Sequence, residues 1–271
     1  MVVLSAEVLS RYPRFSLYNS PYPAHDRGCA IDLYPAEGAP SPVAGEVLET
    51  RTVRAPQKPY APENDHLLLI DCGERIARIL HVDPAVAAGD RIEVGDPLGT
   101  TLRAGFFAPW VDDHVHLGFR APDTNPYRAS GSLPIELETA VEPVAWDGTG
   151  RVIAVGETFV VLDSPAHPAP GDRFAGIAAG SGETALDGGL PHYEGGGALA
   201  GASGPIELLG ERVGLAEGRD VAWDPIEVRA NGEAITGLSL FAGRETLGAK
   251  LVCPGHEFSI GDRIEVAIRG R

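Results

Sequence analysis

The chain has very little lysine. Of its 271 residues, 22 are basic, and Lys58 and Lys250 are the only two lysines, so the other 20 are arginines. With 38 acidic residues, the formal net charge is −16. Nucleic acids and anionic lipid surfaces are bound through basic footprints, so this balance predicts no nucleic-acid partner and no membrane partner. The 44% of hydrophobic residues are enough to bury a sizeable core, which excludes a disordered chain.

Cysteine is scarce and widely spaced. Cys29, Cys72 and Cys253 form no C-x-x-C pair, and an odd number without framework spacing indicates thiols in a reducing compartment. No stretch approaches the roughly 20 apolar residues of a membrane helix. The N-terminus has no basic region followed by a sustained apolar region. These absences predict a cytoplasmic protein.

Long helical periodicity is also missing. The 34 glycines and 23 prolines divide the sequence into short runs. Such runs, rich in β-branched residues and separated by turns, predict an all-β sandwich or barrel. The clearest expected strands are Gly45–Glu49, His66–Ile70, Arg75–Leu80, His114–Phe119, Thr158–Leu162 and Arg263–Ile268.

One turn has a specific signature. Asn231-Gly232 lies between two apolar runs and predicts a type I′ hairpin, because both central residues of that turn need positive φ. The best helix candidate is Ile135–Val144, which is short.

The polar segment 121–134 contains proline and glycine and lacks periodicity, so we place a domain boundary near it. The expected organisation is a β domain over residues 1–122, a linker or short helix over 123–144, and a second, β-rich domain over 145–271.

The strongest chemical signal is the H-x-H pair of His114 and His116. On a strand, alternate side chains share a face, which places the two Cα atoms about 6.6 Å apart. One ring could then bind a metal while the other contacts a water or the substrate. Two hydrogen-bonded histidines on a half-buried strand are the alternative for this motif alone.

Two further residues stand in unusual places. Asp32 is a carboxylate within the otherwise apolar run Ala30–Tyr34, which is costly unless the group is paired or binds a metal. An ion pair with an arginine would also satisfy it. His81 follows the expected strand Ile76–Leu80 and supplies a third imidazole at a strand end.

The order of these features resembles the lysostaphin-type zinc metallopeptidases. The similar segments begin with IDLYP and SPVAGEV, continue with LHVDPAVAAGDRIEVGDPLGTT and end with HVHLGFR, within residues 20–120. The resemblance implies a barrel-sandwich hybrid fold (the duplicated hybrid motif) for the first domain. It also implies one zinc ion, with Asp32 and His116 as ligands and His81 and His114 as catalytic residues that orient water and stabilise an oxyanion.

The sequence departs from the family motif at one ligand. The family places a histidine four residues before the aspartate, where this chain has Gly28. Cys29 has the wrong parity to share a strand face with Asp32. His25 also has the wrong parity, but a kink at Gly28 would bring it in, so we expect His25 to be the third ligand.

Three functions are compatible with this pattern. The first is a zinc-dependent hydrolase that cleaves a peptide or amide bond of a peptide-like or small-molecule substrate, with the second domain binding substrate or a protein partner. The second is a non-catalytic barrel-sandwich binding or scaffold protein with a degenerate or structural metal site. The third is a metalloenzyme of different chemistry that uses the same His/Asp cluster.

Overall fold

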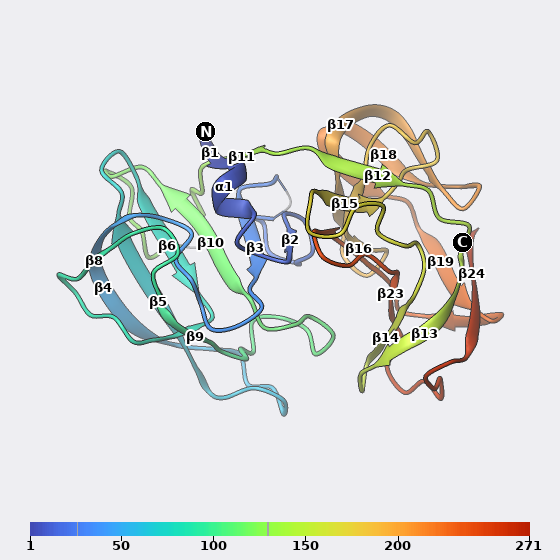
Figure 1. Ribbon diagram of the computed structural model, residues 1–271, viewed down its shortest axis with the longest axis horizontal. Coiled ribbons are helices and arrows are strands. Elements are labelled where there is room, and N and C mark those ends of the chain that lie inside the picture. The colour runs from blue at the N-terminus through green and yellow to red at the C-terminus, as the bar shows by residue number, and fades with distance from the viewer. Residues whose placement is uncertain (26, 129) are drawn as a thin grey trace. The chain divides into compact units, whose positions relative to one another are not determined.

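The structure is a computed structural model that describes residues 1–25, 27–128 and 130–271. It is nearly all-β, as the sequence predicts: in the described parts, the one helix is α1 (Ala6–Leu9) (Figure 1). The chain divides into two compact units, the first made of residues 1–15 and 28–139 and the second of residues 16–27 and 140–271. Among the described residues, no helix is both long and apolar enough to cross a bilayer.

The N-terminal half of the chain contributes short strands. Their bounds are β1 (Val2–Ser5), β2 (Arg14–Ser16), β3 (Ala30–Tyr34), β4 (Gly45–Arg54), β5 (Asn64–Asp71), β6 (Ile76–Leu80), β7 (Val82–Pro84), β8 (Arg91–Ile92), β9 (Gly99–Thr101), β10 (Val115–Arg120) and β11 (Ile135–Glu138).

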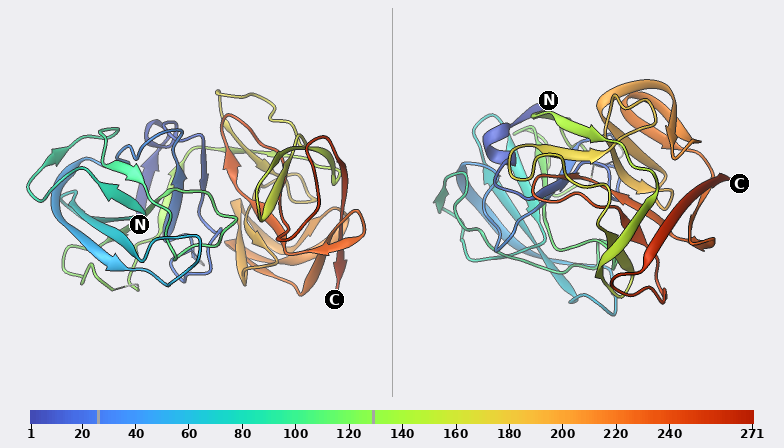
Figure 2. Two further views of the ribbon diagram at one scale, coloured as in Figure 1. Left: turned by 90° about the horizontal axis from the view of Figure 1, so that it is seen from below. Right: turned by 45° about the vertical axis from the view of Figure 1, so that its right-hand side comes forward.

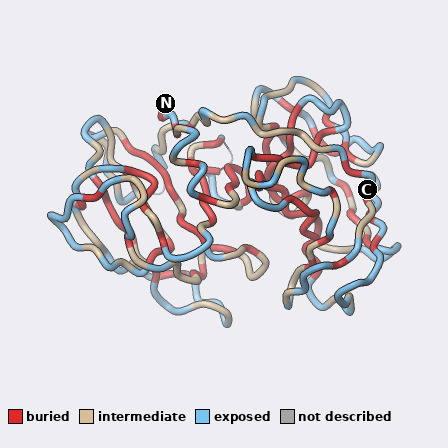
Figure 3. Tube along the Cα trace, in the orientation of Figure 1, coloured by how far each residue is buried: buried red, intermediate tan, exposed pale blue. Residues whose placement is uncertain are grey.

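The first unit is built around an antiparallel sheet with the strand order β3-β10-β6-β5-β4-β8. The strands β4, β5 and β6 lie side by side in every view (Figures 1 and 2). β3 is buried throughout and β10 almost along its whole length, whereas β4 is largely exposed (Figure 3). This burial explains why β10 reads as an apolar run broken by a histidine: a strand covered on both faces needs few polar side chains.

The C-terminal half contributes the remaining strands. Their bounds are β12 (Val141–Val144), β13 (Thr149–Val155), β14 (Phe159–Leu162), β15 (Phe174–Ile177), β16 (Leu186–Leu190), β17 (Gly195–Leu208), β18 (Glu211–Trp223), β19 (Ile226–Ala230), β20 (Glu233–Ile235), β21 (Gly237–Leu240), β22 (Ala242–Gly243), β23 (Lys250–Val252) and β24 (Arg263–Gly270).

The second unit has its own sheet and core. Its ten-stranded sheet has the order β18-β17-β16-β21-β23-β14-β13-β24-β19-β20. The long strands β17 and β18 form an antiparallel hairpin. Apolar residues from strands across this sheet form one buried cluster, which includes Val160, Leu190, Val213, Leu251 and Ile264.

The expected hairpin is confirmed, and the expected helix is wrong. Asn231 and Gly232 have φ values of 50° and 86° and connect β19 to β20. The segment Ile135–Val144 forms two strands instead of a helix, and the first of them, β11, pairs in parallel with β1. Its I-E-L-E alternation has the two-residue period of a strand, and a pairing partner 133 residues away (Val2 for Ile135) cannot be inferred from a local pattern.

Candidate functional site

Asp32 on β3 and His116 on β10 face each other across an antiparallel strand pair. Directly opposite residues in such a pair project to the same face of the sheet. The His116 Nδ1–H donates a hydrogen bond to Asp32 Oδ1 over 2.9 Å. Asp32 is 2% exposed, whereas the His116 side chain is 15% exposed and is the more accessible of the two. The carboxylate that looked misplaced in an apolar strand is therefore paired with a histidine.

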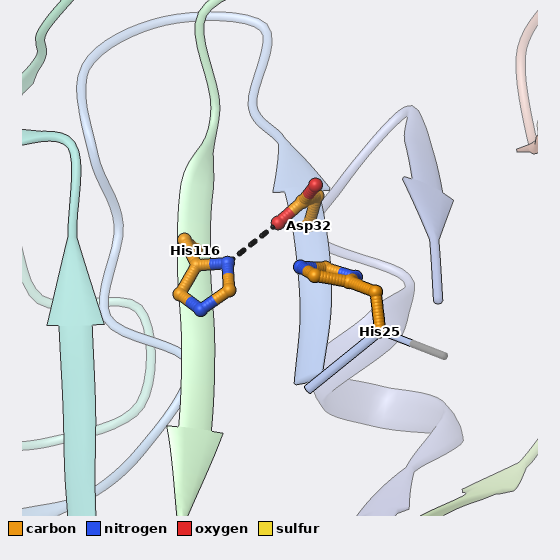
Figure 4. A group of neighbouring side chains, drawn as sticks. All are labelled: His25, Asp32 and His116. Carbon is orange, nitrogen blue, oxygen red and sulfur yellow. Dashed lines mark hydrogen bonds and ion pairs between the residues drawn. The ribbon is translucent and has the colours of Figure 1, made fainter. Parts of the chain in front are cut away.

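His25 lies near this pair, in the irregular segment before β3. Gly28 has a φ of 56°, in the left-handed region that glycine adopts without steric cost, and the chain is kinked there. Ligand-type atoms of His25, Asp32 and His116 all lie within 4.8 Å of one another, and in Figure 4 the three side chains converge. The His25 Nδ1–H donates to the Leu17 carbonyl oxygen over 2.7 Å, which leaves Nε2 as its metal-binding atom.

His114 lies one residue before β10 and is almost completely buried. Its Nδ1–H donates to the Asp112 carbonyl oxygen over 2.8 Å, and its Nε2 is 3.4 Å from Asp32 Oδ1. Burial lowers the pKa of His114 to about 4, although the Asp32 carboxylate opposes the shift. The ring is therefore neutral at neutral pH, and Nε2 carries a lone pair directed at a carboxylate oxygen. Two such acceptors are favourable neighbours only when a proton or a cation lies between them.

His81 reaches the same group through an unusual backbone conformation. Its neighbour Leu80 pairs with His116, so strict alternation would direct His81 to the opposite face of the sheet. Instead His81 has a φ of 66°, in the left-handed region, which ends the alternation. The centroid of its ring lies 4.9 Å from that of His114 and 5.7 Å from that of His116.

Asp65, at the start of β5, fixes the ring of His81. The His81 Nδ1–H donates to Asp65 Oδ2 over 2.7 Å, and the backbone N–H groups of His81 and His66 donate to Asp65 Oδ1. Asp65 is 0% exposed, so this carboxylate has exchanged water entirely for these bonds. The arrangement holds His81 with the proton on Nδ1 and Nε2 available. Asp65 is not among the site residues that we predict from the sequence. The one feature that distinguishes it there is its place as an acidic residue at the start of an apolar strand.

Aromatic side chains surround the imidazoles. Phe107 contacts both His81 and His114, with centroid distances of 5.0 and 4.6 Å, and Tyr34 lies 5.2 Å from His114. Tyr34 and Phe107 belong to a small buried cluster with Ala104 and Val111. This wall lowers the local dielectric, which strengthens every electrostatic interaction in the site.

Two histidines of the second unit, His167 and His256, serve its loops. His167 Nε2–H donates to the Gly243 carbonyl oxygen and His256 Nε2–H to that of Gly156, while the Nδ1 of each ring accepts a backbone N–H two residues further on. Both rings are therefore used within their own turns. Among the described residues, the group that could hold a metal ion is the one formed by His25, Asp32 and His116.

The fold and the site thus define a nearly all-β protein with a buried His/Asp cluster that could bind a metal. Residues 3–137 match the family described as Domain of unknown function (DUF8155) N-terminal domain, and residues 142–269 match its C-terminal domain. Because the two matches together span nearly the whole sequence, the chain belongs to the DUF8155 family.

No curated protein matches the chain. Among solved structures, it is similar to the catalytic domain of the antimicrobial peptidase lysostaphin from Staphylococcus simulans, crystallized in the absence of phosphate. The identity is 20%, the TM-score is 0.31, and the match covers 48% of this chain and 92% of that one.

Proposed function

We propose that the chain is a zinc-dependent hydrolase that cleaves a peptide or amide bond, as its resemblance to the lysostaphin-type metallopeptidases implies. The observation that carries the proposal is the convergence of three ligand-type side chains, His25, Asp32 and His116, beside the neutral imidazole of His114. The second unit would bind part of the substrate or a protein partner.

The donor set suits zinc. Two imidazoles and one carboxylate are ligands that catalytic zinc sites use, with a fourth position left for water or substrate. The hydrogen bond from His25 Nδ1 to a backbone carbonyl is the support that metal-binding histidines usually have. When bound, zinc would act as a Lewis acid and make hydroxide available near neutral pH.

His114 and His81 have the geometry of residues that handle protons beside such a site. The lone pair on His114 Nε2 could accept a hydrogen bond from an attacking water, because Nδ1 already carries the proton. His81 is held by Asp65 so that its Nε2 is free to contact the reacting group. A protonated His81 would donate a hydrogen bond to an oxyanion, and the buried Asp65 carboxylate would stabilise that charge.

A second candidate is a non-catalytic binding protein with a structural metal. It is favoured by Gly28, which occupies the position where the family motif has a ligand. It provides no role for the pairing of His81 with Asp65, which a structural metal site does not require. For that reason we place the hydrolase first.

Metal analysis of protein purified without a histidine tag separates the two. The hydrolase proposal requires close to one zinc per chain, lost in Asp32→Ala and His116→Ala and retained in the control His66→Ala. It also requires that His114→Ala and His81→Ala keep the zinc but lose hydrolysis of a peptide library. Zinc binding with no hydrolysis of any peptide would favour the binding protein, and a wild type that binds no zinc would overturn both proposals.

A further inference from the structure

Arg78 lies on the same face of the sheet as the candidate site. The pairing of β10 with β6 places His116 opposite Leu80 and Gly118 opposite Arg78. Residues that are opposite each other, or two apart on one strand, share a face. Arg78 is therefore a diagonal neighbour of His116, at a separation of about 7–8 Å, which is within reach of long side chains. Gly118, which lies between them on β10, has no side chain to separate the two.

Among the residues that the structure describes, no acidic side chain pairs with Arg78. Its side chain is half-buried, and it forms no hydrogen bond or ion pair with any residue that the structure describes; its Nε in particular is buried without an acceptor. Burial, together with the nearby charge of Arg120, lowers the pKa of Arg78 to about 10, so the guanidinium remains charged at neutral pH. A buried charge without a counterion is destabilising unless a ligand supplies one.

Arg120 provides a contrast on the same face. It is 0% exposed, and its Nη atoms donate to the carbonyl oxygens of Phe119 and Arg128 and to Ser132 Oγ. These bonds fix the loop that follows β10. Arg120 adds positive charge beside Arg78, but both of its Nη groups already have acceptors within the protein. Arg78 is therefore the side chain able to receive an anion from outside.

We propose that Arg78 binds a carboxylate of the substrate, an inference that rests on the hydrolase function proposed above. A guanidinium fork matches a carboxylate in a bidentate geometry. In a chain of net charge −16, which repels anions at long range, such a local positive pair is what an anionic substrate would need. A peptide spans about 3.3–3.6 Å per residue. Because Arg78 and His116 are diagonal neighbours, the carboxylate would lie within a few residues of the bond that is cleaved.

That carboxylate has two possible sources: the C-terminus of a peptide, or an aspartate or glutamate side chain. Calorimetric binding to the zinc-loaded protein distinguishes them with two matched probe pairs. One pair is an acetylated alanine tripeptide as free acid and as amide. The other is a tripeptide blocked at both ends with a central aspartate or asparagine. We expect one acidic probe to bind about 10-fold more tightly than its neutral partner.

Substitutions assign the preference to Arg78. In Arg78→Met, which keeps the apolar length of the side chain, the acidic and neutral probes should bind equally, while Arg78→Lys should retain part of the difference. The exposed Arg91→Met is the matched control and should behave as wild type. Equal binding of both members of each pair by the wild type, or an unchanged preference in Arg78→Met, would overturn the proposal.

The thermal unfolding midpoint separates this role from a structural one. Without ligand, Arg78→Met should unfold at or above the wild-type temperature, because the substitution removes an uncompensated charge. A clearly lower midpoint would assign Arg78 to the fold and count against the proposal. An Arg78-dependent preference for acidic probes without any hydrolysis would support the subsite and overturn the hydrolase function. Hydrolysis without a charge preference would support the hydrolase function and overturn the subsite.

Discussion

Asp65 accepts hydrogen bonds from both the ring and the backbone of His81, through different carboxylate oxygens. Oδ1 receives the backbone N–H of His81 and also that of His66, so an oxygen is required at this position. Oδ2 receives the ring Nδ1–H. The buried carboxylate therefore determines which nitrogen of His81 carries the proton, and this leads to a sharp prediction.

We expect Asp65→Asn to reverse the tautomer of His81. The amide oxygen of asparagine must face the two backbone donors, so its NH2 group would face Nδ1 and force the proton onto Nε2. kcat should fall by roughly 100-fold or more, because asparagine cannot stabilise the positive charge of a protonated His81. KM and zinc content should stay close to the wild-type values, because neither the ligands nor the other walls of the site change.

The matched control is Asp71→Asn, at the other end of β5, where the carboxylate is exposed and accepts a backbone N–H within its turn. It should leave kcat unchanged. Nitrogen-15 NMR of the imidazoles reports the tautomer directly. Full activity in Asp65→Asn, with its NMR signals showing the proton on Nε2, would exclude the role given to His81.

His25 gives the second prediction. In His25→Ala the zinc dissociation constant should rise on the order of 100-fold or more, because one of three protein ligands is lost. Competition with a chromophoric chelator measures it. His66→Ala, which removes a half-buried histidine of the same unit as Asp32, should bind zinc as tightly as the wild type. Unchanged affinity in His25→Ala would show that Gly28 marks a true loss of the third ligand.

The sequence predicts the strands that carry the site better than the positions of its side chains. β3 has the expected bounds, and β10 begins one residue later than expected. Local composition is sufficient for these strands because apolar, β-branched runs flanked by turn residues have few alternatives. The same holds for the hairpin at Asn231, where backbone conformation depends on two neighbouring residues.

Features that depend on tertiary pairing could not be read in this way. The parallel partner of β11 is β1, which lies at the other end of the first unit's sequence. This pairing makes the segment a strand where the local pattern predicts a helix. Likewise, the left-handed backbone of His81 is supported by a carboxylate 16 residues earlier. No window of local sequence contains both groups, so neither the orientation of His81 nor the role of Asp65 could be inferred.

Asp187 gives a stability prediction for the second unit. This carboxylate is 0% exposed and accepts hydrogen bonds from Ser16 Oγ and from the backbone N–H groups of Leu17 and Tyr18. Asp187→Asn would remove the buried negative charge to which these three groups donate. Hydrogen bonds to a charged group contribute about 1.5–3 kcal/mol, so the free energy of unfolding should fall by roughly 2–3 kcal/mol.

Urea denaturation measures this loss. The control is Asp172→Asn, whose carboxylate forms an exposed ion pair with Arg173; its free energy of unfolding should change by less than about 0.5 kcal/mol. Because Leu17 also accepts the hydrogen bond from His25, Asp187→Asn should weaken zinc binding as well. A stability equal to that of the wild type would contradict the structural role of Asp187.

His192 makes the second unit sensitive to acid. Burial lowers its pKa to about 4 in the folded protein, whereas an unfolded chain has a histidine pKa near about 6.5. Above the unfolded value neither state is protonated, so the stability contribution is constant. As the pH falls from about 6.5 towards 4, the unfolded state binds a proton first, and the free energy of unfolding falls by up to about 3 kcal/mol.

We expect His192→Gln to remove this part of the pH dependence. Urea denaturation of both proteins at about pH 7 and about pH 5 tests it, and parallel losses on acidification would exclude His192 as the responsible group.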